Sequence, residues 1–186
     1  MGAALAQAAL DRGFEVTIVA GPVTCDLPDR AEVISVTTTE EMLQACLRHF
    51  PNCVGVIGAA APCDFRPKNI FLEKIKKNQT GAISAELIET PDILAKLGKI
   101  KRQDQWLVPF ALETTEQGRT LAIEKLHRKN GDLVVLNGPS AMFGDRTQVE
   151  IIDRNGATLA EICDTKENVA AQLIEIIQKT QKSTSR

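Results

Sequence analysis

The sequence of 186 residues contains no tyrosine and one tryptophan, and it carries no excess of basic residues. Its formal net charge of −2 and isoelectric point near 5.8 argue against a general nucleic-acid binder. No apolar run reaches the roughly eighteen residues that a membrane helix needs. No Gly-x-Gly-x-x-Gly motif follows an expected strand, which together with the missing tyrosine disfavours a nicotinamide-dependent oxidoreductase. We therefore expect neither a nucleic-acid nor a membrane partner.

The cysteines are odd in number, scattered, and without any Cys-x-x-Cys pair. His49 and His127 lie too far apart in the sequence for a zinc motif. We expect free, mostly buried thiols in a reducing cytosol, and hence a cytoplasmic protein. Cys63 has no histidine nearby in sequence and is expected to be structural. The five are Cys25, Cys46, Cys53, Cys63 and Cys163.

Helices and strands are expected to alternate along the chain. An Ala-rich segment predicts a helix over 2–12, and the remaining helices are expected at 39–50, 91–100, 115–129 and 166–179. Strands are expected at 14–20, 31–36, 54–60, 83–89, 106–112 and 133–136. Asn155-Gly156 predicts a hairpin that joins 148–153 to 158–163. We predict an α/β, Rossmann-like three-layer fold, with a mainly parallel sheet and an appended antiparallel hairpin.

The chain opens directly on a helix. A doubly wound nucleotide-binding fold normally opens with a strand and a Gly-rich loop, whose following helix holds phosphate at its N-terminus. Neither element precedes residue 2 in this sequence. We therefore expect the first strand of the fold to be missing from the chain.

Residues 58–77 combine a small-residue loop with charged groups. The apolar run 54–57 predicts a buried strand, and ligands of open α/β sheets collect beyond the carboxyl ends of such strands. Gly58 and the three alanines after it let a ligand approach the backbone closely. Asp64 adds a carboxylate, and a lysine cluster follows at Lys74, Lys76 and Lys77. This combination suits a nucleoside triphosphate with its metal ion.

Each part of that stretch also has a plainer interpretation. An Ala-rich strand end is compatible with tight packing of helices on the sheet, and a lysine run is usually a solvated surface. The residues by themselves leave both interpretations open. The segment 65–82, with little apolar patterning, is expected to be a mobile loop that orders over the triphosphate as a lid.

The order of motifs resembles the phosphopantothenate–cysteine ligase family, also called phosphopantothenoylcysteine synthetase. The resemblance covers nearly the whole chain, and the loop followed by Glu-Lys-Ile-Lys-Lys is its most specific combination. The segments that carry it are Val-Thr-Ile-Val-Ala-Gly-Pro-Val (16–23), Gly-Ala-Ala-Ala-Pro-Cys-Asp-Phe-Arg (58–66), Glu-Lys-Ile-Lys-Lys (73–77), Glu-Thr-Pro-Asp-Ile-Leu (89–94), Phe-Ala-Leu-Glu-Thr (110–114), and Lys125 with Lys129 before Asn130.

The resemblance implies a ligase of coenzyme A biosynthesis with CTP as co-substrate. CTP would activate the carboxylate of 4′-phosphopantothenate as an acyl-cytidylate, and the amine of cysteine would then displace CMP. Lys74 would be the catalytic residue, Mg²⁺ would accompany the triphosphate, and Asp64 is a weak candidate for the metal. The nucleotide-binding residues would be Gly58, Ala59, Ala60, Ala61, Asp64, Lys74, Pro91, Asp92, Ile93, Leu94, Phe110, Lys125 and Lys129.

The resemblance also implies a homodimer and a flavin-dependent decarboxylase that is fused upstream or associated. We expect residues 1–182 to form a single nucleotide-binding ligase domain, and the polar residues 183–186 to be a disordered tail. Thr90 and Pro109 stand where the family usually has Asn and Gly. The family also places a strand and an Asn-x-Ser-Ser-Gly-Lys segment before this chain's first residues, so we expect this polypeptide alone to be inactive.

The alternative is a nucleotide-binding fragment or paralogue without catalysis, which lacks the N-terminal phosphate loop. The upstream gene sequence would discriminate between the two. The choice between CTP and ATP stays open, because it depends on contacts around Gly58 and Phe110.

Overall fold

The computed structural model describes residues 1–70, 73, 84–112, 117–138 and 146–184. Its helices are α1 (Gly2–Asp11), α2 (Thr39–His49), α3 (Ile93–Ile100), α4 (Gly118–Arg128) and α5 (Lys166–Thr184), with a short 3₁₀ helix η1 (Phe50–Asn52). Its strands are β1 (Thr17–Ala20), β2 (Glu32–Ser35), β3 (Gly55–Gly58), β4 (Phe65–Pro67), β5 (Leu87–Glu89), β6 (Trp106–Leu112), β7 (Leu133–Asn137), β8 (Arg146–Asp153) and β9 (Thr158–Thr165).

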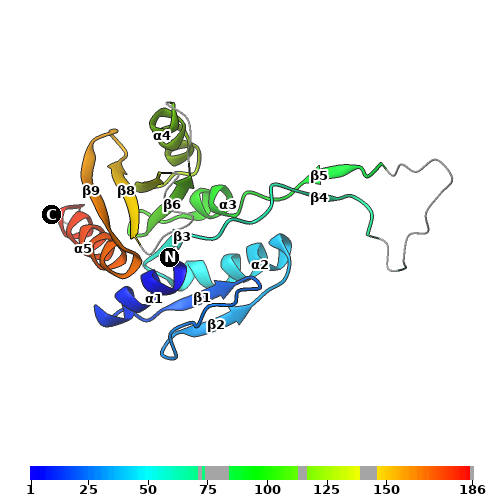
Figure 1. Ribbon diagram of the computed structural model, residues 1–186, viewed down its shortest axis with the longest axis horizontal. Coiled ribbons are helices and arrows are strands. Elements are labelled where there is room, and N and C mark those ends of the chain that lie inside the picture. Colours follow the sequence, from blue (N-terminus) through cyan, green and yellow to red (C-terminus); the bar gives the residue numbers. More distant parts are fainter. Residues whose placement is uncertain (71–72, 74–83, 113–116, 139–145, 185–186) are drawn as a thin grey trace.

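The main sheet has the strand order β3-β6-β7-β8-β9. Strands β3, β6 and β7 pair in parallel, and β8 and β9 add an antiparallel hairpin at the edge. The predicted fold class, a mainly parallel sheet with an appended hairpin, is confirmed. Figure 1 shows helices on both sides of this sheet.

Strands β1 and β2 form a separate two-stranded parallel sheet. Helices on both faces link it to the main sheet. On one face Leu5 of α1 packs into the same apolar cluster as Ile57 of β3, and on the other face α2 contacts β1 and α3. Within the part of the chain that the structure describes, the two sheets are therefore packed together through shared helices and are not paired strand to strand.

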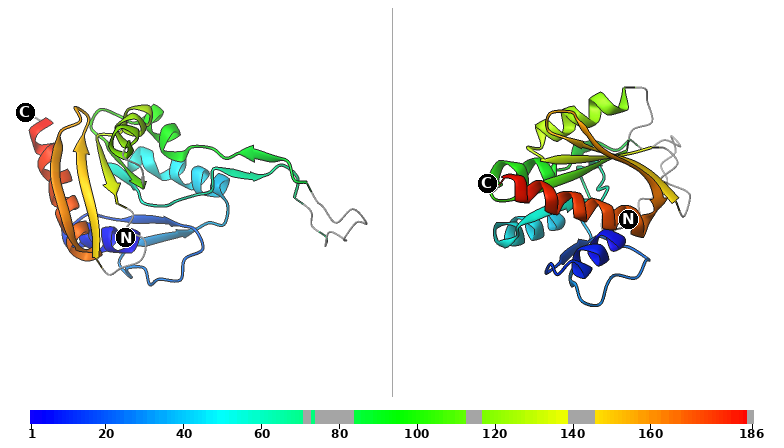
Figure 2. Two further views of the ribbon diagram at one scale, coloured as in Figure 1. Left: turned by 45° about the horizontal axis from the view of Figure 1, so that its top comes forward. Right: turned by 90° about the vertical axis from the view of Figure 1, so that its left-hand side faces the viewer.

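The sheet core is apolar on both faces. One cluster, under α1 and α5, is built from Val108, Val135, Ile151 and Leu173, all with no exposed side-chain surface. Figure 2 shows α5 alongside α1 over this face. The other face packs α2, α3 and α4 against Leu107, Val134 and their neighbours. Alternation along β6 sends even-numbered residues to the first face and odd-numbered ones to the second.

A capping box starts α2. The hydroxyl of Thr38 accepts the backbone N–H of Glu41 at 3.1 Å, and the Glu41 carboxylate accepts the N–H groups of Thr37 and Thr38. These backbone donors lower the pKa of Glu41. The cap satisfies helix N–H groups that have no intrahelical partner, which fixes where α2 begins. Thr38 is thus the N-cap of the helix that the sequence predicts from residue 39.

Strands β4 and β5 form a two-stranded antiparallel ribbon that extends away from the body of the molecule (Figure 1). The sequence analysis placed Phe65–Pro67 in a mobile loop, and that prediction is wrong for these three residues. The strand is short, contains Pro67, and shows no clear alternation. Proline is tolerated here because each strand of a two-stranded ribbon has an unpaired edge. Most of the predicted lid lies outside the described residues.

Helix α5 continues to Thr184, past the predicted end at 179. No Gly or Pro interrupts it after residue 179, and the hydroxyl of Thr180 donates to the Ile176 carbonyl at 2.6 Å within the helix. Residues 183 and 184 of the predicted tail are therefore helical.

Candidate functional site

The carboxyl end of β3 lies against the first turn of α3. A Cβ atom on Gly58 would lie 2.3 Å from Cδ1 of Leu94, so the missing side chain lets the helix start approach the strand end. Both residues belong to the predicted site, although 35 positions separate them in sequence. The structure thus brings the small-residue loop and the 91–94 segment together.

Asp92 is the N-cap of α3, and its Oδ1 accepts the N–H of Ala95 at 3.0 Å. Pro91 lies before the cap, so its predicted place in the first turn of the helix is wrong. The helix begins two residues later, because the Asp92 carboxylate caps it there. Ile93 is buried, and Leu94 is half-buried against β3.

Lys129 joins this helix start from α4. Its Nζ lies 3.3 Å from Oδ1 of Asp92, and its side chain is 19% exposed. Arg128, which the sequence analysis did not select, lies 3.9 Å from Oδ2 of the same carboxylate and is 64% exposed. The helix N-terminus and the two cations thus surround the Asp92 carboxylate, which is the anion that they stabilise in this structure.

Close packing of α3 on the end of α4 positions Lys129. A Cβ on Gly98 would lie 1.9 Å from the Lys129 carbonyl oxygen, so only glycine permits this contact. Asn130 adopts a left-handed φ of 51°, and its side chain donates to the Gly98 carbonyl at 2.9 Å. The Lys129 side chain thus starts beside Gly98 and ends at Asp92. Lys125, half-buried one turn earlier, accepts the Lys129 N–H through its carbonyl at 3.0 Å.

The opposite face of the sheet holds two more predicted residues. Ala59 and Phe110 are partly buried and pack against the cluster under α1 and α5. Phe110 is therefore a core aromatic, and it lies near the carboxyl end of β6, one strand away from Ala59. The predicted residues thus divide between the two faces of the main sheet at the end of β3.

Ala60, Ala61 and Asp64 are exposed where the chain leaves β3 for the ribbon. Thr90 ties the two ends of the ribbon together. Its N–H donates to the Asp64 carbonyl at 2.9 Å, and its hydroxyl donates to the Cys63 carbonyl. This contact brings Asp64 next to the start of the 91–94 segment. Lys74, Lys76 and Lys77 lie outside the described residues.

Among the residues that the structure describes, no three His, Cys, Asp or Glu side chains are placed to hold a metal ion. Nor does any helix in that part of the chain have the length and apolarity to cross a membrane. All five cysteines are free. Cys25, Cys63 and Cys163 are exposed, so the expectation of mostly buried thiols is wrong. Burial raises the pKa of Cys46 and Cys53, which keeps these two thiols protonated.

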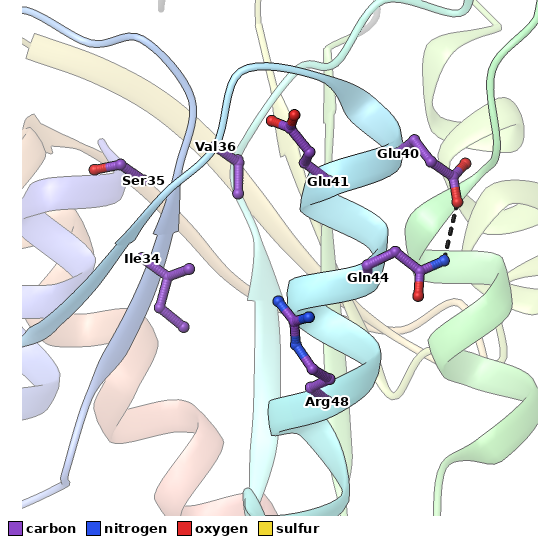
Figure 3. Close-up of a pocket in the computed structure, with 7 residues that line it drawn as sticks. All are labelled: Ile34, Ser35, Val36, Glu40, Glu41, Gln44 and Arg48. Atoms are coloured by element: carbon purple, nitrogen blue, oxygen red, sulfur yellow. Dashed lines mark hydrogen bonds between the residues drawn. The ribbon is translucent and has the colours of Figure 1, made fainter.

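A pocket of about 310 Å³ lies between the end of β2 and α2 (Figure 3). No predicted site residue lines it. Its polar side chains serve the helix, since Glu41 caps α2 and Gln44 donates to Glu40 at 2.9 Å. The candidate site is therefore the β3 strand end rather than this pocket. The pocket is lined by Ile34, Ser35, Val36, Glu40, Glu41, Gln44 and Arg48.

The sheet order and the helices on both faces define a doubly wound, Rossmann-like α/β protein. The chain belongs to the DNA/pantothenate metabolism flavoprotein C-terminal domain family, whose model matches residues 1–181.

Three known proteins illustrate the similarity. A cysteine/cysteine sulfinic acid decarboxylase from an unknown prokaryotic organism is 43% identical, over 95% of this chain and 50% of its own length. The coenzyme A biosynthesis bifunctional protein CoaBC of Borreliella burgdorferi is 33% identical, over 95% and 45%. The crystal structure of the C-terminal domain of a CoaBC protein superposes with a TM-score of 0.80 at 31% identity, over 98% of this chain and 84% of that one. The chain thus spans about half the length of these curated relatives.

Proposed function

We propose that this chain is the phosphopantothenate–cysteine ligase domain of a coenzyme A biosynthesis protein, and that it uses CTP. Family membership and the names of the CoaBC relatives support the pathway. The main structural support for the proposed site is the close contact of Gly58 with Leu94, next to the ion pair of Asp92 and Lys129. These residues lie together at the end of β3, in the segments that the ligase resemblance assigns to the nucleotide, and we propose that bound nucleotide phosphate takes over the contact of Lys129 with Asp92.

The reaction divides into two steps. A carboxylate oxygen of 4′-phosphopantothenate attacks the α-phosphorus of CTP, the bond to the β-phosphate oxygen breaks, and pyrophosphate leaves. The amine of cysteine then attacks the acyl carbon of the acyl-cytidylate, CMP departs, and the amine loses a proton as the amide forms. Neither step oxidises or reduces any atom, so no redox cofactor enters this reaction.

Electrostatic stabilisation is the role proposed for the basic residues. Lys74 would offset the charge that develops on the α-phosphate and on departing pyrophosphate, without a proton transfer. Lys129 and Lys125 would bind the nucleotide from the α4 side. The backbone at 58–61 would approach the nucleotide and the acyl group, and the free N–H groups at the start of α3 suit an oxyanion.

Mg²⁺ would accompany the triphosphate, because magnesium typically binds through phosphate oxygens, one or two carboxylates and water. Asp64 is the carboxylate proposed for it. It is exposed at the ribbon base and close in the chain to the β3 strand end. Phe110 would pack near the base, and the choice of CTP over ATP would depend on its surroundings and on the backbone at Gly58.

The proposed partners follow from the relatives and from the exposed ribbon. Because the curated relatives are about twice as long as this chain, we propose a flavin-dependent decarboxylase that is fused or associated. We also propose a cytoplasmic homodimer that uses the β4–β5 ribbon. Phe65 and Leu87 on this ribbon are 55% and 57% exposed, and covering such apolar side chains favours association.

Substitution of Lys74 tests this function. In the protein with its upstream gene sequence included, Lys74→Gln should reduce pyrophosphate release from CTP and 4′-phosphopantothenate by at least about 100-fold, as expected when a transition-state charge contact is lost. Lys68→Gln is the matched control beside the ribbon, since Lys68 is an exposed lysine whose ammonium group pairs with the exposed Glu86 carboxylate at 2.8 Å. Equal turnover of Lys74→Gln and wild type would refute the role of Lys74.

A further inference from the structure

Thr90 makes two hydrogen bonds at the base of the β4–β5 ribbon. Its N–H donates to the Asp64 carbonyl at 2.9 Å, and its hydroxyl donates to the Cys63 carbonyl. The strand pairing ends one step earlier, where Phe65 lies opposite Glu89. Consecutive carbonyls of an extended strand point in opposite directions, so one residue can reach both only where the chain bends. The structure has this bend at Asp64.

The stretch that carries Asp64 has little packing to hold it. Residues 60–64 are all exposed, whereas Gly58 and Ala59 at the end of β3 are half-buried. A segment with few buried apolar contacts opens locally at a low cost in free energy. The position of this stretch therefore depends on its hydrogen bonds, and two of these come from Thr90.

The conformation of Thr90 is itself restricted. Pro91 follows it, and a residue before proline is strongly biased toward extended backbone conformations. The β-branched side chain of threonine also has few rotamers. On the C-terminal side, Asp92 caps α3 and Ile93 is buried, so the chain is fixed two residues beyond Thr90. Thr90 thus connects the exposed stretch to the fixed start of α3.

The two bonds from Thr90 fix the backbone on both sides of the Asp64 Cα. The Cys63 carbonyl belongs to the peptide unit before Asp64, and the Asp64 carbonyl belongs to the peptide unit after it. Each peptide unit is planar, so the two soft dihedral angles of a residue are set once both flanking planes are held. These angles set the direction of the Cα–Cβ bond. The bonds from Thr90 therefore direct the Asp64 carboxylate.

We propose that Thr90 is a positioning residue, which holds the backbone of Asp64 so that the Asp64 carboxylate meets the Mg²⁺ ion of the bound nucleotide. This inference rests on the proposed function, which assigns Asp64 to the metal. Thr90 acts through Asp64 and not by touching the nucleotide. Without the Thr90 hydroxyl, Asp64 has more backbone conformations in the free protein, and ordering it on binding costs affinity. The cost arises only when the bound nucleotide carries Mg²⁺.

Thr90→Val tests this role, because it removes the hydroxyl and keeps the N–H and the β-branch. In the protein with its upstream gene sequence included, calorimetric CTP binding with Mg²⁺ should weaken about fivefold, as expected for one hydrogen bond. With Mg²⁺ chelated, CTP affinity should stay within twofold of wild type. Thr90→Ser keeps the hydroxyl and should bind like wild type in both conditions. So should the matched control Thr17→Val, whose lost hydroxyl donates to Glu32 at 2.9 Å in β2.

A double variant shows whether Thr90 acts through Asp64. Added to Asp64→Asn, Thr90→Val should change CTP affinity with Mg²⁺ less than twofold further. Additive losses overturn the inference, as do unchanged affinity in Thr90→Val, equal losses with and without Mg²⁺, or CTP binding by wild type that is independent of Mg²⁺. If wild type binds CTP with Mg²⁺ but forms no amide, the proposed ligase function fails while the affinity ratios still decide the role of Thr90. Absence of CTP binding by wild type overturns both.

Discussion

Gly58 and Leu94 lie in close contact within the candidate site. Gly58→Ala should destabilise the protein by about 1–3 kcal/mol, because the added methyl group forces Leu94 out of its place. It should also weaken nucleotide binding, since the helix start would move away from the strand end. Urea unfolding and CTP titration measure the two effects.

A second substitution supplies the control for this prediction. Leu94→Ala removes the three atoms that the new methyl group would meet within 3.0 Å. The double variant should therefore recover part of the loss seen in Gly58→Ala. If the two substitutions change the free energy of unfolding additively, the requirement for glycine at position 58 does not come from its contact with Leu94.

Lys129 and Arg128 approach the same carboxylate but differ in burial. Lys129→Gln should lower CTP affinity about tenfold, as expected when one partly buried charge contact to phosphate is removed. Arg128→Gln, at a side chain 64% exposed, should change it little. Isothermal titration measures both, and an equal loss in the two variants would contradict the role assigned to Lys129.

Among the elements, the β4–β5 ribbon presents an apolar surface to solvent. Its register puts Pro67 opposite Leu87, with Phe65 on the same face. We predict that Phe65→Ser combined with Leu87→Ser converts a dimer into a monomer in light scattering. Val33→Ser, at an apolar side chain of β2 that is 42% exposed, is the control and should leave the mass unchanged. A monomeric wild type would refute the proposed dimer.

Long patterned elements could be predicted from the sequence, and short ones could not. Strand β6 has the predicted bounds, 106–112, because it is a continuous apolar run next to a turn. The sequence analysis missed β4 because three residues that include a proline are too few to show an alternation of apolar and polar side chains. The start of α3 was placed at Pro91 instead of after Asp92, since propensity cannot tell a first-turn residue from one before the cap.

Part of the site was accessible to sequence reasoning and part was not. The Gly58 loop, the 91–94 segment and Lys129 follow from the resemblance, and the structure brings them together. The contact of Arg128 with Asp92 depends on how the end of α4 packs against α3, which no local sequence pattern shows.

At the scale of the whole molecule, the β1–β2 sheet is separate from the main sheet. We expect the strand edges that this separation leaves unpaired to lower both stability and nucleotide affinity. Strand β3 is only half-buried along its length, whereas Leu133–Val135 of β7 are buried. A parallel strand between β1 and β3 would join the sheets and cover these edges. We predict weak or undetectable CTP binding and a tendency to aggregate for the 186-residue chain.

Extending the chain by about thirty to forty upstream residues, enough for a strand, a loop and a phosphate-binding turn, should correct both properties. Hydrogen exchange should then show new protection of the β1 and β3 amides. Micromolar CTP affinity of the unextended chain, or no change in β1 and β3 protection on extension, would contradict this prediction.

Product analysis of the extended protein tests the central claim most directly. With 4′-phosphopantothenate, cysteine, Mg²⁺ and CTP, mass spectrometry should detect phosphopantothenoylcysteine, with CMP and pyrophosphate formed in equal amounts. Without cysteine, the acyl-cytidylate should accumulate on the enzyme. Formation of CDP and phosphate, or CTP binding without any amide product, would contradict a ligase that works through an acyl-cytidylate.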